Sequence, residues 1–482
     1  MARSNLIQSE RTKLPRLLGA DLHGVVRGQQ AASLMSQLRR AVHAGSLREG
    51  TLLPATRALA GDLGVSRGVV VRAYEQLVAE GYLTSHQGRG TQVARVHHPE
   101  PAATPLAAVY RPTNPGLPPG GMFPRAAWLR STTRALTGLP DADLGYGDPA
   151  GLPRLRQELS SYLGRVRALV APPDRILVVN GFAQASRLLA DVLTVRGVRE
   201  IGLEDPGSVG LREQLTQAGL TCVPVPVDEE GIRVEDLVGS GLRVVVVTPA
   251  HQFPTGVVTS PARRHALVRW ARETDSLVVE DDYDAEFRYD RTPVGALQGL
   301  DPDVVAYGGS ISKTLAPGLR IGWLVLPAHH VAAFTDAKYA TDLGTGVLEQ
   351  ATLADFLACG AMDHHIRAMT TRYRTRRDHL VQALATHLPD WTVTGTSAGL
   401  HLMVHPGRKY DEAALAALAQ RCGLDARPLS QYAIRSPDRP GLVIGYGHQH
   451  TGHLAEAVAT LARTRGGRGT GSGTTASRIT PS

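Results

Sequence analysis

Hydrophobic and polar residues alternate along this chain at two different spacings. Between residues 24 and 94, hydrophobic residues recur at helical spacing, as at Leu34, Leu38 and Val42. Farther along, short runs of β-branched residues alternate with amphipathic stretches, and these runs lie at 176–179, 243–247, 276–279 and 304–306. Hydrophobic runs separated by helices are typical of parallel strands covered on both faces. The pattern predicts a small helical domain followed by a larger α/β domain.

Segments without such spacing separate the two domains and end the chain. Residues 96–121 are rich in Pro, Ala and Gly and predict a semi-extended linker. The Gly, Ser, Thr and Arg residues of 466–482 predict a disordered tail. We therefore expect an N-terminal tail at 1–23, one domain at 24–95 and a second domain at 122–465.

The first domain shows the pattern of a helix-turn-helix. A second helix is predicted at 54–63, and a third helix runs from Arg67 to about Glu80 after the turn Gly64–Ser66, whose serine can cap it. Two helices joined by a short turn that contains Gly form this motif, and the amino end of the second of them enters a major groove. The buried face of the third helix is expected at Val70, Tyr74 and Leu77.

A β-hairpin is predicted next, at 82–93, with Gly88, Arg89 and Gly90 at its tip. An arginine flanked by glycines can approach a DNA phosphate or the minor groove closely. The sequence pattern of this domain therefore predicts an interface for double-stranded DNA. The residues expected at this interface are Arg57, Ser66, Arg67, Arg72, Gln87, Gly88 and Arg89.

The distribution of charge agrees with a polyanionic partner. The first 95 residues contain 13 Lys and Arg against 6 Asp and Glu, whereas the rest of the chain contains 39 against 38. A small basic domain ahead of a neutral one favours nucleic acid. Charge alone leaves open a basic domain that is merely soluble.

Composition argues against several other classes of protein. Cys222, Cys359 and Cys422 lie far apart without paired spacing, which argues against a disulfide framework and against a zinc site. The first residues lack the hydrophobic stretch of a signal peptide, and no hydrophobic run reaches the ~18 residues of a membrane span. We expect a cytoplasmic protein without a metal site.

Lysine is rare here, with 4 residues against 48 arginines. A primary amine can lose its proton and form a Schiff base, which a guanidinium cannot. Lys13, Lys338 and Lys409 are expected on solvated loops. Lys313 lies among serines, a glycine and an arginine, as an anion site requires, and it is the candidate catalytic nucleophile.

The surroundings of Lys313 supply the parts that hold pyridoxal phosphate. Asp281, at the carboxyl end of a predicted strand, can keep the ring nitrogen protonated, which the ring needs to withdraw electrons. Tyr283, two residues on, can hydrogen-bond the ring's phenolic oxygen. An acidic run such as 280–284 is by itself more often a solvated loop or a metal site. The phosphate is expected to contact Ser310, Ser312 and Arg320 together with the free N–H groups of Gly181, Phe182 and Ala183.

Residues 53–93 resemble the winged helix-turn-helix of the GntR family over the whole module. In that family, polar residues usually follow the Ser-Arg pair that begins the third helix. Here Gly68 and Val69 stand in those positions. The resemblance implies a fold that binds DNA.

Residues 123–461 resemble fold-type I aminotransferases. The phrases at 144–152, 248–256 and 280–289 are similar to those of MocR-type regulators, which join a GntR-type winged helix to an aminotransferase-like domain. The resemblance implies an α/β fold with a large domain at about 140–345 and a small domain at about 346–465. It also implies a homodimer in which Tyr146 or its neighbours reach the partner's cofactor.

Three positions depart from that family's pattern. Ser208 stands where a tyrosine usually stacks on the cofactor. Phe253 stands where aminotransferases carry an asparagine to the phenolic oxygen, a role open to His251 or Gln252. The stretch 442–446 lacks the arginine that holds a substrate carboxylate. Arg439 lies nearby and is the candidate contact for an effector.

These observations support three hypotheses. We expect a transcriptional regulator whose second domain senses an amino compound, or pyridoxal phosphate itself. The alternative is an aminotransferase with an appended DNA-binding domain, although the stretch 442–446 predicts weak half-reaction chemistry at most. A regulator whose pocket has lost the cofactor is the third hypothesis, because Ser208 removes the stacking ring.

Overall fold

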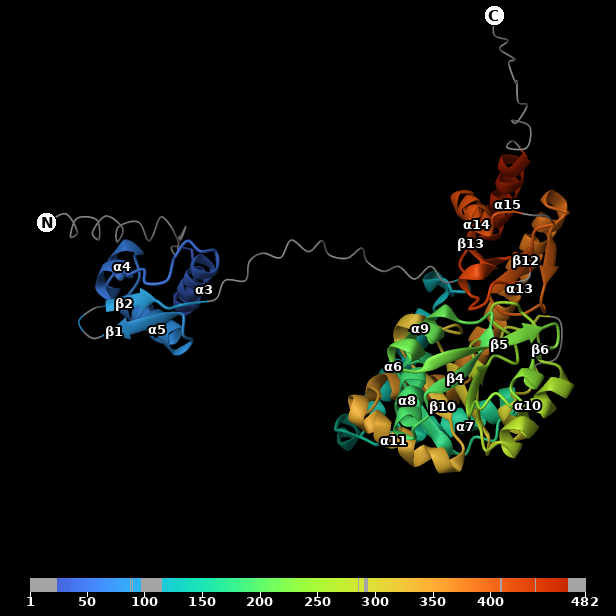
Figure 1. The fold of residues 1–482 in the computed structure, drawn as a ribbon. Coiled ribbons are helices and arrows are strands. Elements are labelled where there is room, and N and C mark those ends of the chain that lie inside the picture. The colour runs from blue at the N-terminus through green and yellow to red at the C-terminus, as the bar shows by residue number, and fades with distance from the viewer. Residues whose placement is uncertain are drawn as a thin grey trace, which may run out of the picture. The chain divides into compact units, whose positions relative to one another are not determined.

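The computed structural model describes residues 24–86, 88, 90–96, 115–284, 286–289, 294–407, 410–437 and 439–466. The chain divides into two compact units, Met1–Arg111 and Pro112–Ser482 (Figure 1). Lys13, Gln87, Arg89 and Lys409, which the sequence analysis names, lie outside the described residues. Each unit is described by itself below.

The first unit is a winged helix-turn-helix, as predicted. It contains α3 (Gln30–His43), α4 (Thr56–Asp62) and α5 (Arg67–Ala79), preceded by the short helix η1 (Arg27–Gln29). Strands β1 (Leu83–His86) and β2 (Gly90–Val93) pair antiparallel to form the wing. A single hydrophobic core joins the three helices to the wing through Leu34, Leu38, Leu59, Val70, Leu77 and Leu83.

The start of α5 differs in two details from the prediction. Ser66 occupies the N-cap position, but its side chain makes no capping hydrogen bond. Val69 is only 3% exposed and packs inside the unit, whereas Gly68 is exposed. The apolar residue after Arg67 is therefore part of the core, and the exposed side of α5 is left to Arg67 and Arg72.

The second unit is built on an eight-stranded mixed sheet with the order β3-β10-β9-β8-β7-β4-β5-β6. Strands β5, β4, β7, β8 and β9 pair in parallel, whereas β10 is antiparallel to both of its neighbours. The strands are β3 (Ile176–Val179), β4 (Glu200–Asp205), β5 (Thr221–Asp228), β6 (Gly231–Ile232), β7 (Val244–Val247), β8 (Leu277–Asp282), β9 (Val305–Ser310) and β10 (Gly322–Val325). Four of these strands, β3, β7, β8 and β9, coincide with the β-branched runs of the sequence.

Helices cover both faces of this sheet, as continuous hydrophobic strands require. Along β7, Val244 and Val246 belong to one core, while Val245 and Val247 belong to the core on the opposite face. The helices of this large layer are α6 (Arg125–Gly138), α7 (Pro153–Arg167), α8 (Phe182–Val195), α9 (Val209–Gln217), α10 (Pro261–Glu273), α11 (Ala328–Asp342) and α12 (Val347–Ala358). The α/β fold class is confirmed.

A smaller antiparallel sheet with the order β11-β12-β14-β13 follows in the chain. Its strands are β11 (Thr392–Thr394), β12 (His401–His405), β13 (Asp425–Pro428) and β14 (Leu442–Gly445), and its helices are α13 (Ala361–His387), α14 (Glu412–Arg421) and α15 (Thr451–Gly466). Pro115 and Gly116, which were expected in the linker, are buried against this part of the body, and Gly116 approaches Leu400. The packed body therefore begins by Pro115.

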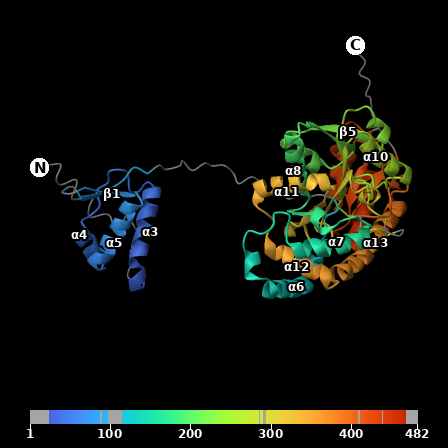
Figure 2. The ribbon, with the colours of Figure 1, turned by 90° about the horizontal axis from the view of Figure 1, so that it is seen from below.

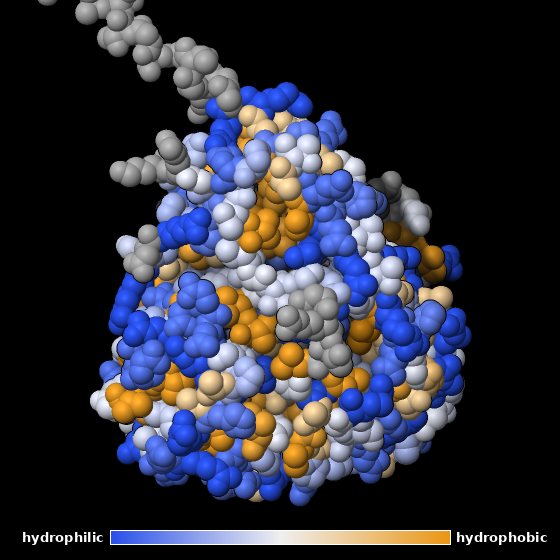
Figure 3. Space-filling view, turned by 90° about the vertical axis from the view of Figure 1, so that its right-hand side faces the viewer, coloured by the Kyte–Doolittle hydropathy of each residue, from blue (hydrophilic) through white to orange (hydrophobic). Residues whose placement is uncertain are grey.

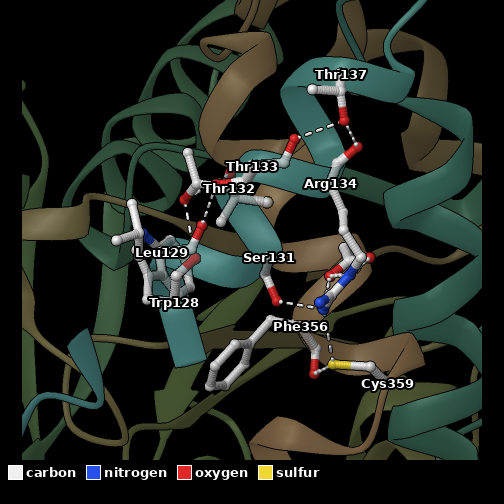
Figure 4. Close-up of polar contacts among 11 residues, drawn as sticks. Trp128, Leu129, Ser131, Thr132, Thr133, Arg134, Thr137, Phe356 and Cys359 are labelled. Carbon is white, nitrogen blue, oxygen red and sulfur yellow. Dashed lines mark hydrogen bonds and ion pairs between the residues drawn. The ribbon is translucent and has the colours of Figure 1, made fainter. Parts of the chain in front are cut away.

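Helix α6 lies beside α12 (Figure 2). Arg134 on α6 donates from Nε and Nη2 to the carboxylate of Asp355 on α12, with an Nη2–Oδ2 distance of 2.5 Å. The same Nη2 lies 3.2 Å from Oγ of Ser131 and 3.6 Å from Sγ of Cys359 (Figure 4). This polar contact fixes α6 on the body while Leu129 and Leu136 of the helix remain exposed.

The surface of the body is mixed in character. On the face drawn in Figure 3, hydrophobic residues form separate patches among polar and charged residues. None of the helices in the described part of the chain combines the length and apolar character needed to cross a membrane.

Candidate functional site

A cavity of about 160 Å³ lies in the body where the carboxyl ends of the parallel strands meet residues of the small sheet. Lys313, Asp281 and Tyr283 all line it. Glu204 and Thr248 contribute from the ends of β4 and β7, and His401 comes from the start of β12. The structure thus brings together the three residues that the sequence analysis placed around the cofactor ring.

Lys313 follows β9 and is half-buried. Burial lowers the pKa of its ammonium, although the carboxylates of Asp284 and Asp281 oppose that effect. A lowered pKa increases the fraction of neutral amine, which is the form that attacks a carbonyl carbon.

Asp281 lies near the carboxyl end of β8 and lines the cavity. Its neighbour Asp282 points to the opposite face of the sheet, because successive side chains of a strand alternate between the two faces. Burial, together with the nearby carboxylates of Asp282, Glu204 and Asp284, raises the pKa of Asp281 well above its ordinary value. Asp282 is instead paired with Arg167, at an Nε–Oδ2 distance of 2.7 Å. A bound cation beside Asp281 would therefore favour its charged form.

Tyr283 belongs to a buried chain of polar groups behind the cavity. Its hydroxyl lies 3.1 Å from Nδ1 of His251, and the same nitrogen lies 3.0 Å from Oδ1 of Asp284. Nδ1 can either donate to Asp284 or accept from Tyr283, but not both at once. Burial and the nearby carboxylates of Asp284 and Asp281 raise the pKa of Tyr283 well above its ordinary value, so the phenol keeps its proton.

Ligand atoms of His251, Asp284 and His401 lie within 4.8 Å of one another, which is the donor set of a transition-metal site. The hydrogen bonds of two of these residues to each other, and the contact of His401 Nε2 with the carbonyl of Pro254 at 3.2 Å, already occupy them. Burial and the neighbouring His251 hold the pKa of His401 well below its usual range. The trio therefore forms a buried hydrogen-bonded wall of the cavity.

His251 and Gln252, the two residues that could take the role of the missing asparagine, make different contacts in the structure. His251 reaches Tyr283, as described above. Gln252 is fully buried and uses its amide to hold Glu204, the carbonyl of Pro206 and the backbone of Thr255. Phe253 itself packs against the rings of Tyr283, His401 and Tyr432. His251 is thus the residue placed to act on the tyrosine.

The residues predicted to hold a phosphate meet at the amino end of α8. Gly181 is the N-cap, with a φ of +80° that favours glycine, and the helix start has no side-chain cap. A Cβ on Gly181 would lie 3.0 Å from Nη2 of Arg320, and one on Gly322 would lie 3.3 Å from Cβ of Ser310. Gly181, Ser310 and Arg320 are therefore neighbours around free N–H groups, which is the arrangement that binds anions.

Other predicted residues lie elsewhere. Tyr146 is 91% exposed and borders a groove with Leu343 rather than the cavity. Arg439 is exposed and does not line the cavity within the described part of the chain. Ser208 lines the cavity as the N-cap of α9, with its hydroxyl accepting from the N–H of Leu211. The stacking ring of the family is thus replaced by a cap.

Two charged residues of the wall were missed by the sequence analysis. Glu204 is 6% exposed, and burial raises its pKa to about 7 against the hydrogen bonds from Thr248 and Gln252. Its Oε1 has no hydrogen-bond partner among the described residues. Arg212 of α9 also lines the cavity. Glu204 lies on β4, and Arg212 lies on α9, the helix that follows β4 in the chain. The hydrophobic pattern did not predict β4, so neither residue was expected at the end of a strand.

A clasp joins the two sheets beside the cavity. The carboxylate of Asp205, at the end of β4, accepts hydrogen bonds from the N–H groups of Ile434 and Arg435 at 2.7 and 2.9 Å. The N–H of Gly207 donates to the carbonyl of Tyr432 at 3.0 Å. We call these three hydrogen bonds the Asp205 clasp.

Comparison with known proteins agrees with both units. Residues 123–448 match the family described as aminotransferase class I and II, and residues 30–93 match the bacterial regulatory proteins of the gntR family. The probable rhizopine catabolism regulatory protein MocR of Rhizobium meliloti is 34% identical over 456 residues, which covers 89% of this chain and 92% of that relative. The HTH-type pyridoxine biosynthesis transcriptional regulator PdxR of Corynebacterium glutamicum is 32% identical and covers 89% and 94%.

A solved structure extends the comparison. The kynurenine aminotransferase of Pyrococcus horikoshii is 26% identical, with a TM-score of 0.66 over 73% of this chain and 90% of that one. The match of the family model over most of the body and the identity to whole-length relatives lead to one conclusion. This chain belongs to the MocR-type family, in which a gntR-family regulatory domain precedes an aminotransferase class I and II domain.

Proposed function

We propose that this protein is a DNA-binding transcriptional regulator that senses an amino compound, or pyridoxal phosphate itself, in the cavity of its body. One observation carries the proposal: Lys313, Asp281 and Tyr283 share a cavity in a chain that also contains a winged helix-turn-helix. Family membership implies pyridoxal phosphate, and the residues present fit that group. When bound, pyridoxal phosphate supplies an aldehyde that reacts with amines and a ring that withdraws electrons.

The chain's own residues have distinct roles in this proposal. Lys313 offers the amine, and its lowered pKa keeps that amine reactive. Asp281 holds a proton on the ring nitrogen by ion pairing. Tyr283 donates to the phenolic oxygen while Nδ1 of His251 donates to Asp284, so that both donors are used. The free N–H groups at the start of α8, with Ser310 and Arg320, hold the phosphate.

The effector side of the cavity carries charges of both signs. Arg212 lines it together with Tyr432 and Ile434, and Glu204 lies on the wall formed by the large sheet. Arginine suits a carboxylate or another acidic group. The charges therefore favour an effector that has an acidic group besides its amine. In a titration, such a compound should change the visible spectrum and the DNA affinity at the same concentration; a change in only one of them contradicts the proposal.

The DNA interface is proposed on the exposed side of α5. Arg67 and Arg72 are exposed there, and Arg57 is exposed on α4. Nε of Arg72 lies 3.3 Å from the carbonyl of Gly68, so that this side chain is already oriented along the helix. These positions agree with a helix that enters a major groove by its amino end.

Arg67→Ala should weaken binding to a duplex that the purified protein has selected from random sequences. The expected loss is roughly 1–3 kcal/mol if Arg67 contacts a base edge. Arg39→Ala is the matched control, because Arg39 pairs with Glu80 at the other end of α5. Fluorescence anisotropy against salt measures both. Equal weakening on random DNA makes Arg67 a phosphate contact, and no weakening on either DNA contradicts the interface.

We propose that the body forms a homodimer. The supporting observation is a set of exposed hydrophobic residues on α6 and the segment after it: Leu129, Leu136, Leu144 and Tyr146. Leu129 and Leu136 are seven positions apart and so share one face of the helix. Light scattering of the cofactor-bound protein should give twice the 51.4 kDa of one chain. A mass near that of one chain at micromolar concentration contradicts this assembly.

A further inference from the structure

Lys338 occupies a position opposite to the one predicted for it. A solvated loop is the sequence-based expectation for it, but its side chain, on α11, is 0% exposed. Its Nζ lies 2.8 and 2.9 Å from the two carboxylate oxygens of Asp342 and 3.2 Å from Oε1 of Gln184. A buried ammonium is costly unless it is paired, so a lysine at this position requires a charged or polar partner.

The partners of Lys338 lead directly to the amino end of α8. Nε2 of Gln184 donates to Oδ2 of Asp342 at 2.6 Å, and Nδ2 of Asn180 donates to the same oxygen at 2.9 Å. The N–H of Asn180 donates to Oε1 of Gln184 at 2.8 Å. Asn180 is therefore held through both its backbone and its side chain by the Lys338 network.

Arg320 completes the fixation of Asn180. Its Nη2 donates to the carbonyl of Asn180 at 2.6 Å. With its N–H, its carbonyl and its side chain all bound, Asn180 cannot rotate, and Gly181 follows it directly. The free N–H groups of residues 181–183 therefore point in one fixed direction, as an anion site needs.

The negative charge of Asp342 is the one feature of this arrangement that disfavours a bound phosphate. The carboxylate orders Asn180 and Gln184, but its negative charge lies beside the end of α8 that would hold a phosphate. A negative charge near bound phosphate is repulsive, and partial burial strengthens the repulsion. The ammonium of Lys338, in contact with both oxygens, cancels that charge without removing the hydrogen bonds. Lysine suits the position because it is a compact charge on a flexible chain, whereas arginine is a wide planar group.

We propose that Lys338 is a positioning residue for the phosphate of the coenzyme: it neutralises Asp342, so that Asp342 can order the amino end of α8 without repelling a dianion. The inference rests on the proposed binding of pyridoxal phosphate in this body. It concerns the phosphate alone and not the ring, which separates it from the roles of Lys313, Asp281 and Tyr283.

Two ligands that differ only in the phosphate test the proposal. Lys338→Met should weaken the binding of pyridoxal phosphate roughly 5- to 30-fold, the effect of a charge at a helix terminus in a partly buried setting. Binding of pyridoxal, which has the same ring without the phosphate, should not change. The visible absorbance band and the quenching of intrinsic fluorescence measure both affinities. The double variant Lys338→Met/Asp342→Asn should recover affinity for pyridoxal phosphate, because the uncompensated charge is gone.

Controls separate this effect from a general loss of structure. Arg187→Met removes a cation from the exposed i,i+4 pair with Asp191 farther along α8, and it should leave both affinities unchanged. Equal weakening for both ligands in Lys338→Met, or no recovery in the double variant, overturns the proposal. If Lys338→Met does not fold, Asp342→Asn decides: its affinity for pyridoxal phosphate should be retained or increased, and a decrease overturns the proposal. Wild-type protein that binds no pyridoxal phosphate contradicts the proposed function instead.

Discussion

Lys313→Arg is expected to abolish the visible absorbance band that arises when the amine of Lys313 forms a Schiff base with pyridoxal phosphate. Arginine keeps the positive charge and most of the volume, but its guanidinium does not form a covalent bond with the aldehyde. Lys313 makes no hydrogen bond to another described residue that would be lost, so the fold should persist. Absorbance spectra, thermal unfolding and DNA anisotropy of the variant measure these three properties. Folding and basal DNA affinity should stay close to those of the wild type.

A chemical control identifies the reacting amine. Borohydride reduction of the wild-type protein, followed by peptide mass mapping, should place the added mass on the peptide that contains Lys313. The same treatment of Lys313→Arg should give no modified peptide. Survival of the Schiff-base band in the variant, or an added mass on Lys338, would refute the assignment. The spectral response to amino compounds should be lost together with the band.

Asp281→Asn is expected to stabilise the cofactor-free protein and to weaken cofactor binding. The raised pKa of Asp281 means that burial and the neighbouring carboxylates disfavour its charge. Asparagine carries no charge, so the variant does not have that cost. The variant loses the ion pair to the ring nitrogen, so affinity for pyridoxal phosphate should fall on the order of 10- to 100-fold. Thermal unfolding and absorbance titration measure the two effects.

The pH dependence of this difference has a defined sign. The folded protein binds the Asp281 proton more tightly than the unfolded chain does, because its pKa is raised on folding. The wild type therefore loses stability as pH rises from the ordinary pKa of aspartate, about 4, to the raised value. The stability gained by Asp281→Asn should grow across that window and then level off. A gain that is largest at low pH contradicts this account.

The neighbouring carboxyl group provides a matched contrast. Asp282 forms a buried ion pair with Arg167, and the side chains of Arg167 and Asp282 are 2% and 3% exposed. Asp282 also accepts a hydrogen bond from the hydroxyl of Tyr307 at 2.8 Å. Asp282→Asn should destabilise the protein by about 3–5 kcal/mol, because it leaves the arginine buried without its partner. Adjacent substitutions of the same kind thus have opposite expected effects on the cofactor-free protein. If both destabilise it equally, Asp281 does not have the proposed environment.

Much of the fold follows from local patterns in the chain. The helical spacing of Leu34, Leu38 and Val42 and the turn before Arg67 were sufficient for the first unit, because that unit is built from neighbouring segments. In the body, the all-valine run at 244–247 could be predicted because both of its faces are buried. Strand β5 could not, since its residues 221–228 include two prolines and are only partly buried.

The candidate site shows the limit of local patterns more sharply. Lys313 was found because an amine has chemistry that arginine lacks. Lys338 was misjudged because its burial depends on α8, whose Gln184 approaches it only in the folded chain, although its other partner Asp342 is one helical turn away. Asp281 and Asp282 are adjacent and chemically identical in the sequence. Which of them faces the cavity, and which faces Arg167, depends on the pleat of β8 and on what packs against each side.

The Asp205 clasp ties the segment at 432–435, part of which lines the cavity, to the carboxyl end of β4. Two of its hydrogen bonds converge on a single carboxylate, so the loop at 432–435 cannot withdraw by a small amount while keeping one of them well aligned. Because Tyr432 and Ile434 line the cavity, a ligand that touches them from inside also touches the segment that this single carboxylate holds.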